Sequence, residues 1–171
     1  MKSTGKTNKL KVYCETSFWS YLVGGRTTDT KIAADQALTQ KWWEEIAPRC
    51  KIYISQYVVA EAGRGDSGMS MARKCAMRNA VAINSRPDDV DPVAEKLMQG
   101  HAVPSSEGTD ALHIATASVY GMDVLLTWNC KHMANPVTLP RTASILAQTG
   151  YDCPVIITPA EFITRKEEFG L

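Results

Sequence analysis

The sequence has no long hydrophobic run. No segment approaches the roughly 20 apolar residues that a membrane-spanning helix needs, so we expect no membrane partner. Residues 1–9 are polar and basic and no apolar run follows them, which argues against a secretory signal and favours a short flexible tail. Residues 3–7 in this tail resemble the end of a P-loop, but a P-loop follows a strand, whereas these residues precede one.

The sequence also lacks a paired-cysteine motif. Its five cysteines are odd in number and scattered, and no two of them form a Cys-x-x-Cys pair. This pattern argues against a disulfide framework and against a zinc site. It favours a reducing compartment, and we therefore expect a cytoplasmic protein. The cysteines are Cys14, Cys50, Cys75, Cys130 and Cys153.

There is almost no excess of charge of either sign. The chain has 19 Lys and Arg residues against 18 Asp and Glu residues, which gives a net charge of +1. A strongly basic chain would have indicated a nucleic-acid partner, and this composition leaves the function open. With 171 residues, of which 44% are hydrophobic, residues 10–171 can form one domain with a full core.

Short apolar segments alternate with helical patterns along the chain. Alternating strands and helices form a parallel sheet that helices cover on both faces. The predicted fold class is therefore α/β, with a central parallel sheet of about five strands. The predicted strands are residues 10–14, 51–55, 81–83, 124–127 and 155–157.

Several predicted helices have distinctive faces or starts. The helix predicted over residues 28–46 places Ile32, Ala33 and Trp42 on one side, and Trp42 is assigned to packing. Asp91 and Pro92 are predicted to begin a later helix, because proline suits the first helical position. The methionine-rich segment 69–77 is assigned to core packing, with a homodimer or partner-protein groove as the second interpretation.

The segment 108–136 combines a helix, a buried strand and a polar loop. Asp110 lies in the first turn of the predicted helix, and Asn129, Lys131 and His132 follow the strand. A helix that leads into a neighbouring strand runs antiparallel to it, so the helix start and the strand end share one edge of the sheet. In open α/β sheets ligands bind at this carboxyl-end edge. The segment therefore predicts a polar site there.

Two further carboxylates are expected at the same edge. Glu15 ends the first predicted strand, and Glu61 lies about 8 Å into the helix that follows the second, with a side chain that leans back toward the helix start. Crowded carboxylates repel one another unless a cation neutralises them. Oxygen ligands without a His or Cys cluster select magnesium or manganese, which suit phosphate chemistry. The residues predict a metal-dependent phosphodiesterase with Glu15, Glu61, Asp110 and Asn129 as ligands.

Each of these residues also has a simpler explanation. Asp110 could serve only as an acidic residue at a helix start. Glu61 could be a solvated surface residue, and Asn129 could form the turn after a strand. Glu15 is harder to explain in this way, because apolar residues surround it in the sequence. The expected meeting of all four at one edge favours the site.

Three strings of the sequence resemble those of PIN-domain ribonucleases. They are VYCETS at residues 12–17, ISQYVVAEAGRGD at residues 54–66, and DALHIA followed by LLTWNCKH between residues 110 and 132. Their order and spacing agree with the family's, over nearly the whole chain. The resemblance implies a compact Rossmann-like α/β/α domain whose acidic pocket binds magnesium or manganese. Many members of this family are the VapC-type toxin of a toxin–antitoxin pair.

By position, the resemblance assigns the family's four acidic places to Glu15, Glu61, Asp110 and Asn129. Most members have Asp at the first place, and the longer side chain of Glu15 alters its distance to the metal. The fourth place is often Asp, and Asn129 removes one negative charge. Both changes occur in a branch of the family with ETS and TWN-KH strings, and we interpret them as variation within the family.

Neighbouring polar residues are candidates for binding the substrate. Arg64, Lys131 and His132 could hold its phosphate backbone, and each could instead be an ordinary surface or loop residue. Ser17, like Thr16, could donate a hydrogen bond beside Glu15 or cap the following helix. His113, inside the helix that begins near Asp110, is assigned to packing.

The leading functional hypothesis is an endoribonuclease that uses magnesium or manganese, acts on RNA as a toxin, and is bound by an antitoxin protein. A catalytically weak nucleic-acid-binding or regulatory module with the same fold is one alternative. A metal-dependent phosphatase for small molecules is another, because the same oxygen ligands would serve it.

Overall fold

Five strands form one parallel sheet in the computed structural model, which describes residues 9–171. Their spatial order is β3-β2-β1-β4-β5, so β1 lies at the centre. All five predicted strands are confirmed, with ends that differ by at most one residue. Of the predicted tail only residue 9 is described, and the string at residues 3–7 lies outside the described residues. The strands are β1 (Lys11–Cys14), β2 (Lys51–Ser55), β3 (Val81–Ile83), β4 (Val124–Leu126) and β5 (Val155–Ile157).

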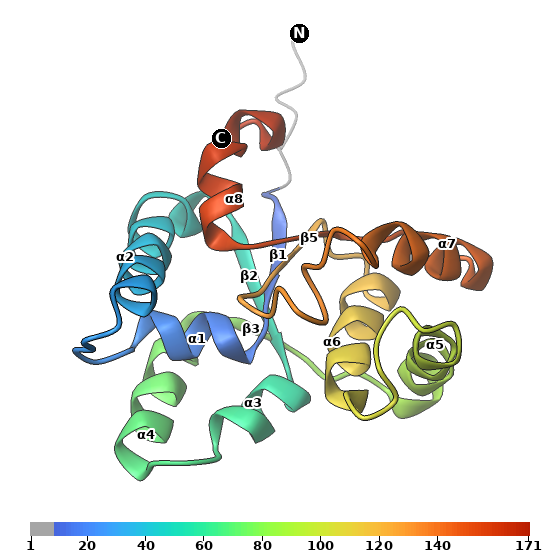
Figure 1. Ribbon diagram of the computed structural model, residues 1–171, viewed down its shortest axis with the longest axis horizontal. Helices are drawn as coiled ribbons and strands as arrows, with labels where there is room; N and C mark the ends of the chain where they lie inside the picture. The colour runs from blue at the N-terminus through green and yellow to red at the C-terminus, as the bar shows by residue number, and fades with distance from the viewer. Residues whose placement is uncertain (1–8) are drawn as a thin grey trace, which may run out of the picture.

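Helices cover both faces of the sheet, which confirms the three-layer α/β/α prediction. Helices α5, α6 and α7 lie on one side, and α1, α2 and α8 lie on the other (Figure 1). From residue 9 onward, no helix is both long and apolar enough to span a membrane. The helices are α1 (Thr16–Leu22), α2 (Thr30–Glu45), α3 (Gln56–Ala62), α4 (Ser67–Ala76), α5 (Pro87–Gln99), α6 (Gly108–Val119), α7 (Leu139–Thr149) and α8 (Pro159–Thr164), with short 3-10 turns at Ala47–Arg49, Met77–Asn79 and Lys166–Phe169.

The two central strands are buried on both faces. Val12, Tyr13 and Cys14 of β1 and all three residues of β4 are inaccessible to solvent. Strands covered on both sides read as continuous apolar runs rather than alternating ones, which is why these segments were recognisable in the sequence.

The chain order creates a switch point at the centre of the sheet. From β1 the chain moves outward through β2 and β3, then returns to place β4 on the other side of β1. Connections that leave in opposite directions open a crevice at the carboxyl ends of the two strands between them. Here these are β1 and β4, so the strand order predicts the crevice where Glu15 and the loop from Thr127 onward begin.

Two helix predictions were wrong in detail. Helix α5 begins at Pro87, with Asp88 and Asp89 in its first turn, and Pro92 lies inside it on the solvent side. Proline occurs twice in this segment, and the earlier one, Pro87 directly after Arg86, starts the helix. In α2 the buried residues are Asp35, Thr39 and Trp42, whereas the predicted core residue Ile32 is 36% exposed.

The tertiary environment of α2 explains its rotation. Trp42 packs edge-on against Phe18 and Phe162 in the core, which confirms its packing role. One turn earlier, Thr39 accepts a hydrogen bond at 2.8 Å from the indole nitrogen of Trp128. A polar side chain with a buried partner can thus occupy the core face.

The methionine-rich segment divides between the core and the surface. Met77 is buried, as predicted, but Met71 on α4 is 63% exposed. Helix α4 has only one face against the rest of the protein, and Met71 lies on the other. Assigning this residue to the core was wrong.

Candidate active site

Glu15 lies at the end of β1 and is itself the N-cap of α1. Its carboxylate accepts hydrogen bonds from the backbone nitrogen of Ser17, at 2.9 Å, and from the Ser17 hydroxyl. Its own backbone nitrogen donates to the carbonyl of Leu126 on β4. Glu15 is buried, so the strand end, the helix start and the neighbouring strand together hold its carboxylate in the crevice. Capping was considered for Ser17, but Glu15 performs it.

Glu61 on α3 reaches back to the same edge. Its Oε2 atom accepts a hydrogen bond from Thr16 Oγ1 at 2.5 Å and lies 2.8 Å from His113 Nε2. Burial raises the pKa of Glu61, but the hydrogen bonds and charge of His113 and the hydrogen bond of Thr16 outweigh it, and the net pKa lies below the usual range. The Glu61 side chain is only 25% exposed, so it is not the solvated surface residue considered as an alternative.

A hydrogen-bonded chain runs from Glu61 into the core. His113 is 1% exposed, and its Nδ1 atom lies 2.7 Å from the hydroxyl of Tyr13. That hydroxyl lies 2.7 Å from Ser55 Oγ. Burial raises the pKa of Tyr13 well above its usual value, so the hydroxyl keeps its proton. The Nε2 hydrogen of the imidazole goes to Glu61, and Nδ1 shares a hydrogen bond with the protonated Tyr13 hydroxyl.

The sequence did not reveal this series of hydrogen bonds. His113 was assigned to packing, and it is buried, but both of its ring nitrogens also have polar partners. The available signal was its position three residues after Asp110, because residues three apart share one helix face. Tyr13 and Ser55 gave no signal, since each is inside or at the end of an otherwise apolar strand.

Asp110 and Asn129 are in direct contact. The Asn129 amide nitrogen donates to Asp110 Oδ2 at 2.8 Å, and its amide oxygen accepts from the backbone nitrogen of His132 at 3.0 Å. Asn129 therefore both forms the turn and binds the carboxylate. Burial raises the pKa of Asp110, Asn129 and His113 lower it, and the negative charges of Glu15 and Glu107 raise it further, with a net upward shift.

The loop after β4 is anchored from several sides. The backbone nitrogen of Trp128 donates to Ser17 Oγ at 2.7 Å, and its indole ring stacks on Tyr21 with centroids 5.4 Å apart. The backbone nitrogen of Asn129 donates to Thr127 Oγ1 at 2.8 Å. These contacts fix the position from which Asn129 meets Asp110. No pattern in the sequence indicated that Trp128 has this role.

The predicted substrate-binding residues differ in their surroundings. Ser17 bonds internally to Glu15 and Trp128, so its hydroxyl serves the protein itself. Lys131 is exposed beside Asn129, and His132 is half-buried with Nε2 3.8 Å from Glu107 Oε1. Arg64 is exposed, and its charge helps to lower the pKa of Glu61.

The oxygen ligands present suit an ion such as magnesium, which keeps several of its waters. They are too few to enclose an ion entirely in protein ligands. Within residues 9–171, no group of three or more His, Cys, Asp or Glu side chains is placed to hold a metal ion. Glu15 and Asp110 are nonetheless close enough for one charge to raise the pKa of the other carboxyl. Magnesium is commonly held by one or two carboxylates and keeps several waters. Asp110 and Glu15, with the Asn129 amide beside them, meet that smaller requirement.

We expect Asp110→Asn to leave the metal-free protein at least as stable as the wild type. The raised pKa of Asp110 means that its ionised form is disfavoured in the folded protein, and the amide oxygen of the variant can still accept from Asn129. The cost of ionisation is present above the folded pKa and disappears as the pH falls through it. Thermal melting in EDTA should therefore show the largest advantage of the variant at neutral pH and a smaller one near pH 4. A variant that melts well below the wild type at neutral pH would contradict this account.

Comparisons with known proteins establish the fold. No protein-family model matches the sequence, and no curated protein matches it either. A chain in the crystal structure of VapBC2 from Rickettsia felis, bound to a DNA fragment from their promoter, is similar in structure with a TM-score of 0.56 and 13% sequence identity. The match covers 86% of this chain and 97% of that one. The chain therefore has a PIN-like α/β fold of the kind found in VapBC2.

Proposed function

We propose that the protein is an endoribonuclease that depends on magnesium or manganese. The observation that carries this proposal is the placement of Asp110 beside Asn129 and within electrostatic reach of Glu15, at the switch point between β1 and β4. An acidic group that burial and neighbouring negative charge hold in an unfavourable ionised state is typical of a site that binds a cation. The similarity of fold to a VapBC2 chain supports the choice of nuclease chemistry.

Each of the four residues has a distinct part in this proposal. Asp110 and Glu15 would hold the ion directly. Asn129 orients Asp110 through its amide nitrogen. Glu61 accepts both of its hydrogen bonds on Oε2, so its Oε1 atom is available to a ligand, and His113 and Thr16 keep the carboxylate ionised. Fixed ligands of this kind do not have to rearrange when charge develops in the reaction.

The chemistry proposed is hydrolysis of a phosphodiester bond. A divalent ion, when bound, stabilises negative charge on the phosphate and makes water more acidic. Arg64 and Lys131 are exposed cations near Glu61 and Asn129, and they are proposed to hold the phosphates on either side of the scissile bond. His132 joins them when protonated. Ser17 is proposed to position Glu15 and the Trp128 loop rather than to touch the substrate, because its hydroxyl bonds to both.

We further propose that the protein is the toxin of a toxin–antitoxin pair and that an antitoxin protein binds it. Support comes from the fold similarity to a chain of VapBC2. The exposed Met71 on α4 and Val59 on α3 are apolar side chains that a partner protein or a second copy of this chain could cover. Co-expression with the protein encoded by a neighbouring gene should then relieve growth arrest caused by this chain alone.

A nucleic-acid-binding module with weak or no catalysis is the second candidate. The observation that favours it is that Glu15, Glu61 and Asp110 each already accept hydrogen bonds from protein donors. Carboxylates that already accept hydrogen bonds from the protein bind a metal ion less readily than free ones. This candidate predicts RNA binding that does not change when divalent ions are removed.

Metal titration combined with RNA cleavage tests the proposal. At a magnesium or manganese concentration ten times its Kd, we expect the free energy of unfolding to rise by about 1.4 kcal/mol, because only the folded protein has the site. The same ions should permit cleavage of a structured RNA, and EDTA should stop it. Sodium chloride at equal ionic strength measures the non-specific effect of salt. RNA binding without cleavage under all of these conditions would favour the binding module.

A further inference from the structure

A basic pocket lies at the opposite end of the sheet from Glu15 and Asp110. It has a volume of about 990 Å³ and its wall includes Lys9, Lys11, Arg49, Lys51 and Tyr53. Lys11 and Glu15 stand at the two ends of β1, about 13 Å apart at the rise of a parallel strand. The pocket therefore cannot be part of the candidate active site.

Strand register brings these cations together. Lys11 pairs with Lys51 across β1 and β2, so their side chains leave the same face of the sheet at neighbouring positions. Lys9 lies two residues before Lys11, and its Nζ reaches the carbonyl of Pro48 at 2.9 Å, next to Arg49. Lys51 Nζ also lies 5.3 Å from the centre of the Tyr53 ring. Four positive side chains thus surround one hollow.

None of these four cations forms an ion pair with a described residue. Among residues 9–171, no carboxylate lies within 4 Å of the side-chain nitrogens of these four cations. The eight residues that precede Lys9 contain no Asp or Glu. Asp123 also lines the pocket, but its Oδ2 accepts a hydrogen bond from the backbone nitrogen of Lys11 at 2.7 Å. Like charges at facing positions of neighbouring strands repel, so folding alone gives no reason for Lys11 to stand beside Lys51.

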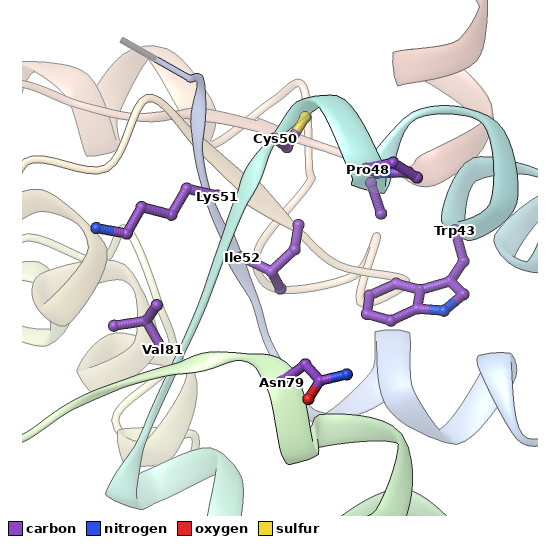
Figure 2. A pocket seen from close by; sticks show the side chains of 8 residues that line it. Trp43, Pro48, Cys50, Lys51, Ile52, Asn79 and Val81 are labelled. Atoms are coloured by element: carbon purple, nitrogen blue, oxygen red, sulfur yellow. The ribbon is translucent and has the colours of Figure 1, made fainter.

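A second, mostly apolar pocket at this end of the sheet also has Lys51 in its lining. It has a volume of about 340 Å³ and is lined by Trp43, Ile52 and Val81, among others. Ile52 and Tyr53 point to opposite faces of the sheet, because successive residues of a strand alternate. Figure 2 shows the Lys51 side chain extending away from Trp43 and Pro48. The ammonium group of Lys51 is therefore available to the basic pocket.

We propose that Lys9, Lys11, Arg49 and Lys51 form a binding site for a ligand with several adjacent phosphate groups. An anion between Lys11 and Lys51 removes their repulsion, and Arg49 can bind a phosphate with two parallel hydrogen bonds. Free polyphosphates and the backbone of a nucleic acid share this chemistry. The site goes beyond the proposed nuclease function and does not depend on it.

Binding in EDTA to ligands that cannot be cleaved tests this site. The probes are tripolyphosphate, ATP and a fluorescent 2′-O-methyl RNA, with affinity followed over a range of salt concentrations. Lys11→Gln combined with Lys51→Gln should weaken binding about tenfold or more. For the RNA it should also reduce the slope of log affinity against log salt by about 1.4, since each single-strand phosphate contact contributes about 0.7.

Matched variants separate this site from general charge and from the candidate active site. Lys41→Gln with Lys96→Gln changes the net charge equally at exposed positions outside the pocket and should bind as the wild type does. In an Asp110→Asn background, the Lys11→Gln and Lys51→Gln pair should cause the same loss of binding as in the wild-type background, whether or not the nuclease proposal holds. Competition by tripolyphosphate supports a polyphosphate ligand, and RNA binding that tripolyphosphate does not displace, yet the pocket variant loses, supports a nucleic acid. Equal losses in both lysine pairs, or no binding of any probe by the wild type at low salt, would overturn the proposal.

Discussion

Asp110→Asn should reduce RNA cleavage by at least about 100-fold while the protein stays folded. The substitution keeps the shape of the side chain and can keep the contact with Asn129, but it removes the negative charge that is proposed to hold the metal ion. A bound ion contributes several kcal/mol to stabilising charge in the reaction, and each 1.36 kcal/mol is a factor of ten in rate. Single-turnover cleavage at saturating magnesium measures the loss directly.

Asp88→Asn is the matched control for this experiment. Asp88 also lies in the first turn of a helix, α5, but it is exposed and outside the crevice. Its substitution removes the same charge from the same kind of helix position, where it contributes about 0.3–1 kcal/mol to stability. Cleavage by this variant should match the wild type. If Asp110→Asn cleaves as fast as Asp88→Asn, Asp110 does not serve as a metal ligand and the proposed site is wrong.

His113→Leu should destabilise the protein by about 3 kcal/mol, which corresponds to a fall in Tm of roughly 10 °C for a chain of this size. The leucine fills a similar volume but leaves Tyr13 without its donor–acceptor partner and Glu61 with only Thr16. Buried polar groups that lose a partner carry the full cost of leaving water. Glu61 should also become easier to protonate, since His113 lowers its pKa.

A double-mutant cycle with Tyr13→Phe shows whether the residues act as one chain. Tyr13→Phe removes the hydroxyl that joins His113 to Ser55 and should cost about 2 kcal/mol alone. The double variant should lose about 1 kcal/mol less stability than the sum of the losses in the two single variants, because both changes break the same contact. Tyr120→Phe, which loses a hydroxyl bonded to the exposed backbone nitrogen of Arg86, should cost less than about 1 kcal/mol. If the losses of stability from His113→Leu and Tyr13→Phe were strictly additive, the two residues would not act through a shared hydrogen bond.

Local patterns in the sequence were enough to locate every strand and to predict the end of the sheet at which the candidate residues lie. Strands such as Val124–Leu126 are short apolar runs between glycine and polar residues, and this signal is local. Once the strands are located and taken to be parallel, the topology of an α/β fold puts Glu15, Asp110 and Asn129 at the carboxyl ends of the strands. The assignment of metal binding to these residues stays a prediction that the experiments above test.

The partners of these residues, in contrast, depend on long-range packing and became visible only in the folded protein. The pairing of His113 with Glu61 joins residues 52 positions apart on different helices, and no local pattern encodes it. The rotation of α2 depended on Trp128, a residue from a distant loop. The meeting of Lys11 and Lys51 follows from the register of β1 and β2, which long-range burial of the sheet faces sets. Periodicity specifies elements, whereas contacts between elements depend on how the whole core packs, and this is why the charges of the site and of the basic pocket emerged only in three dimensions.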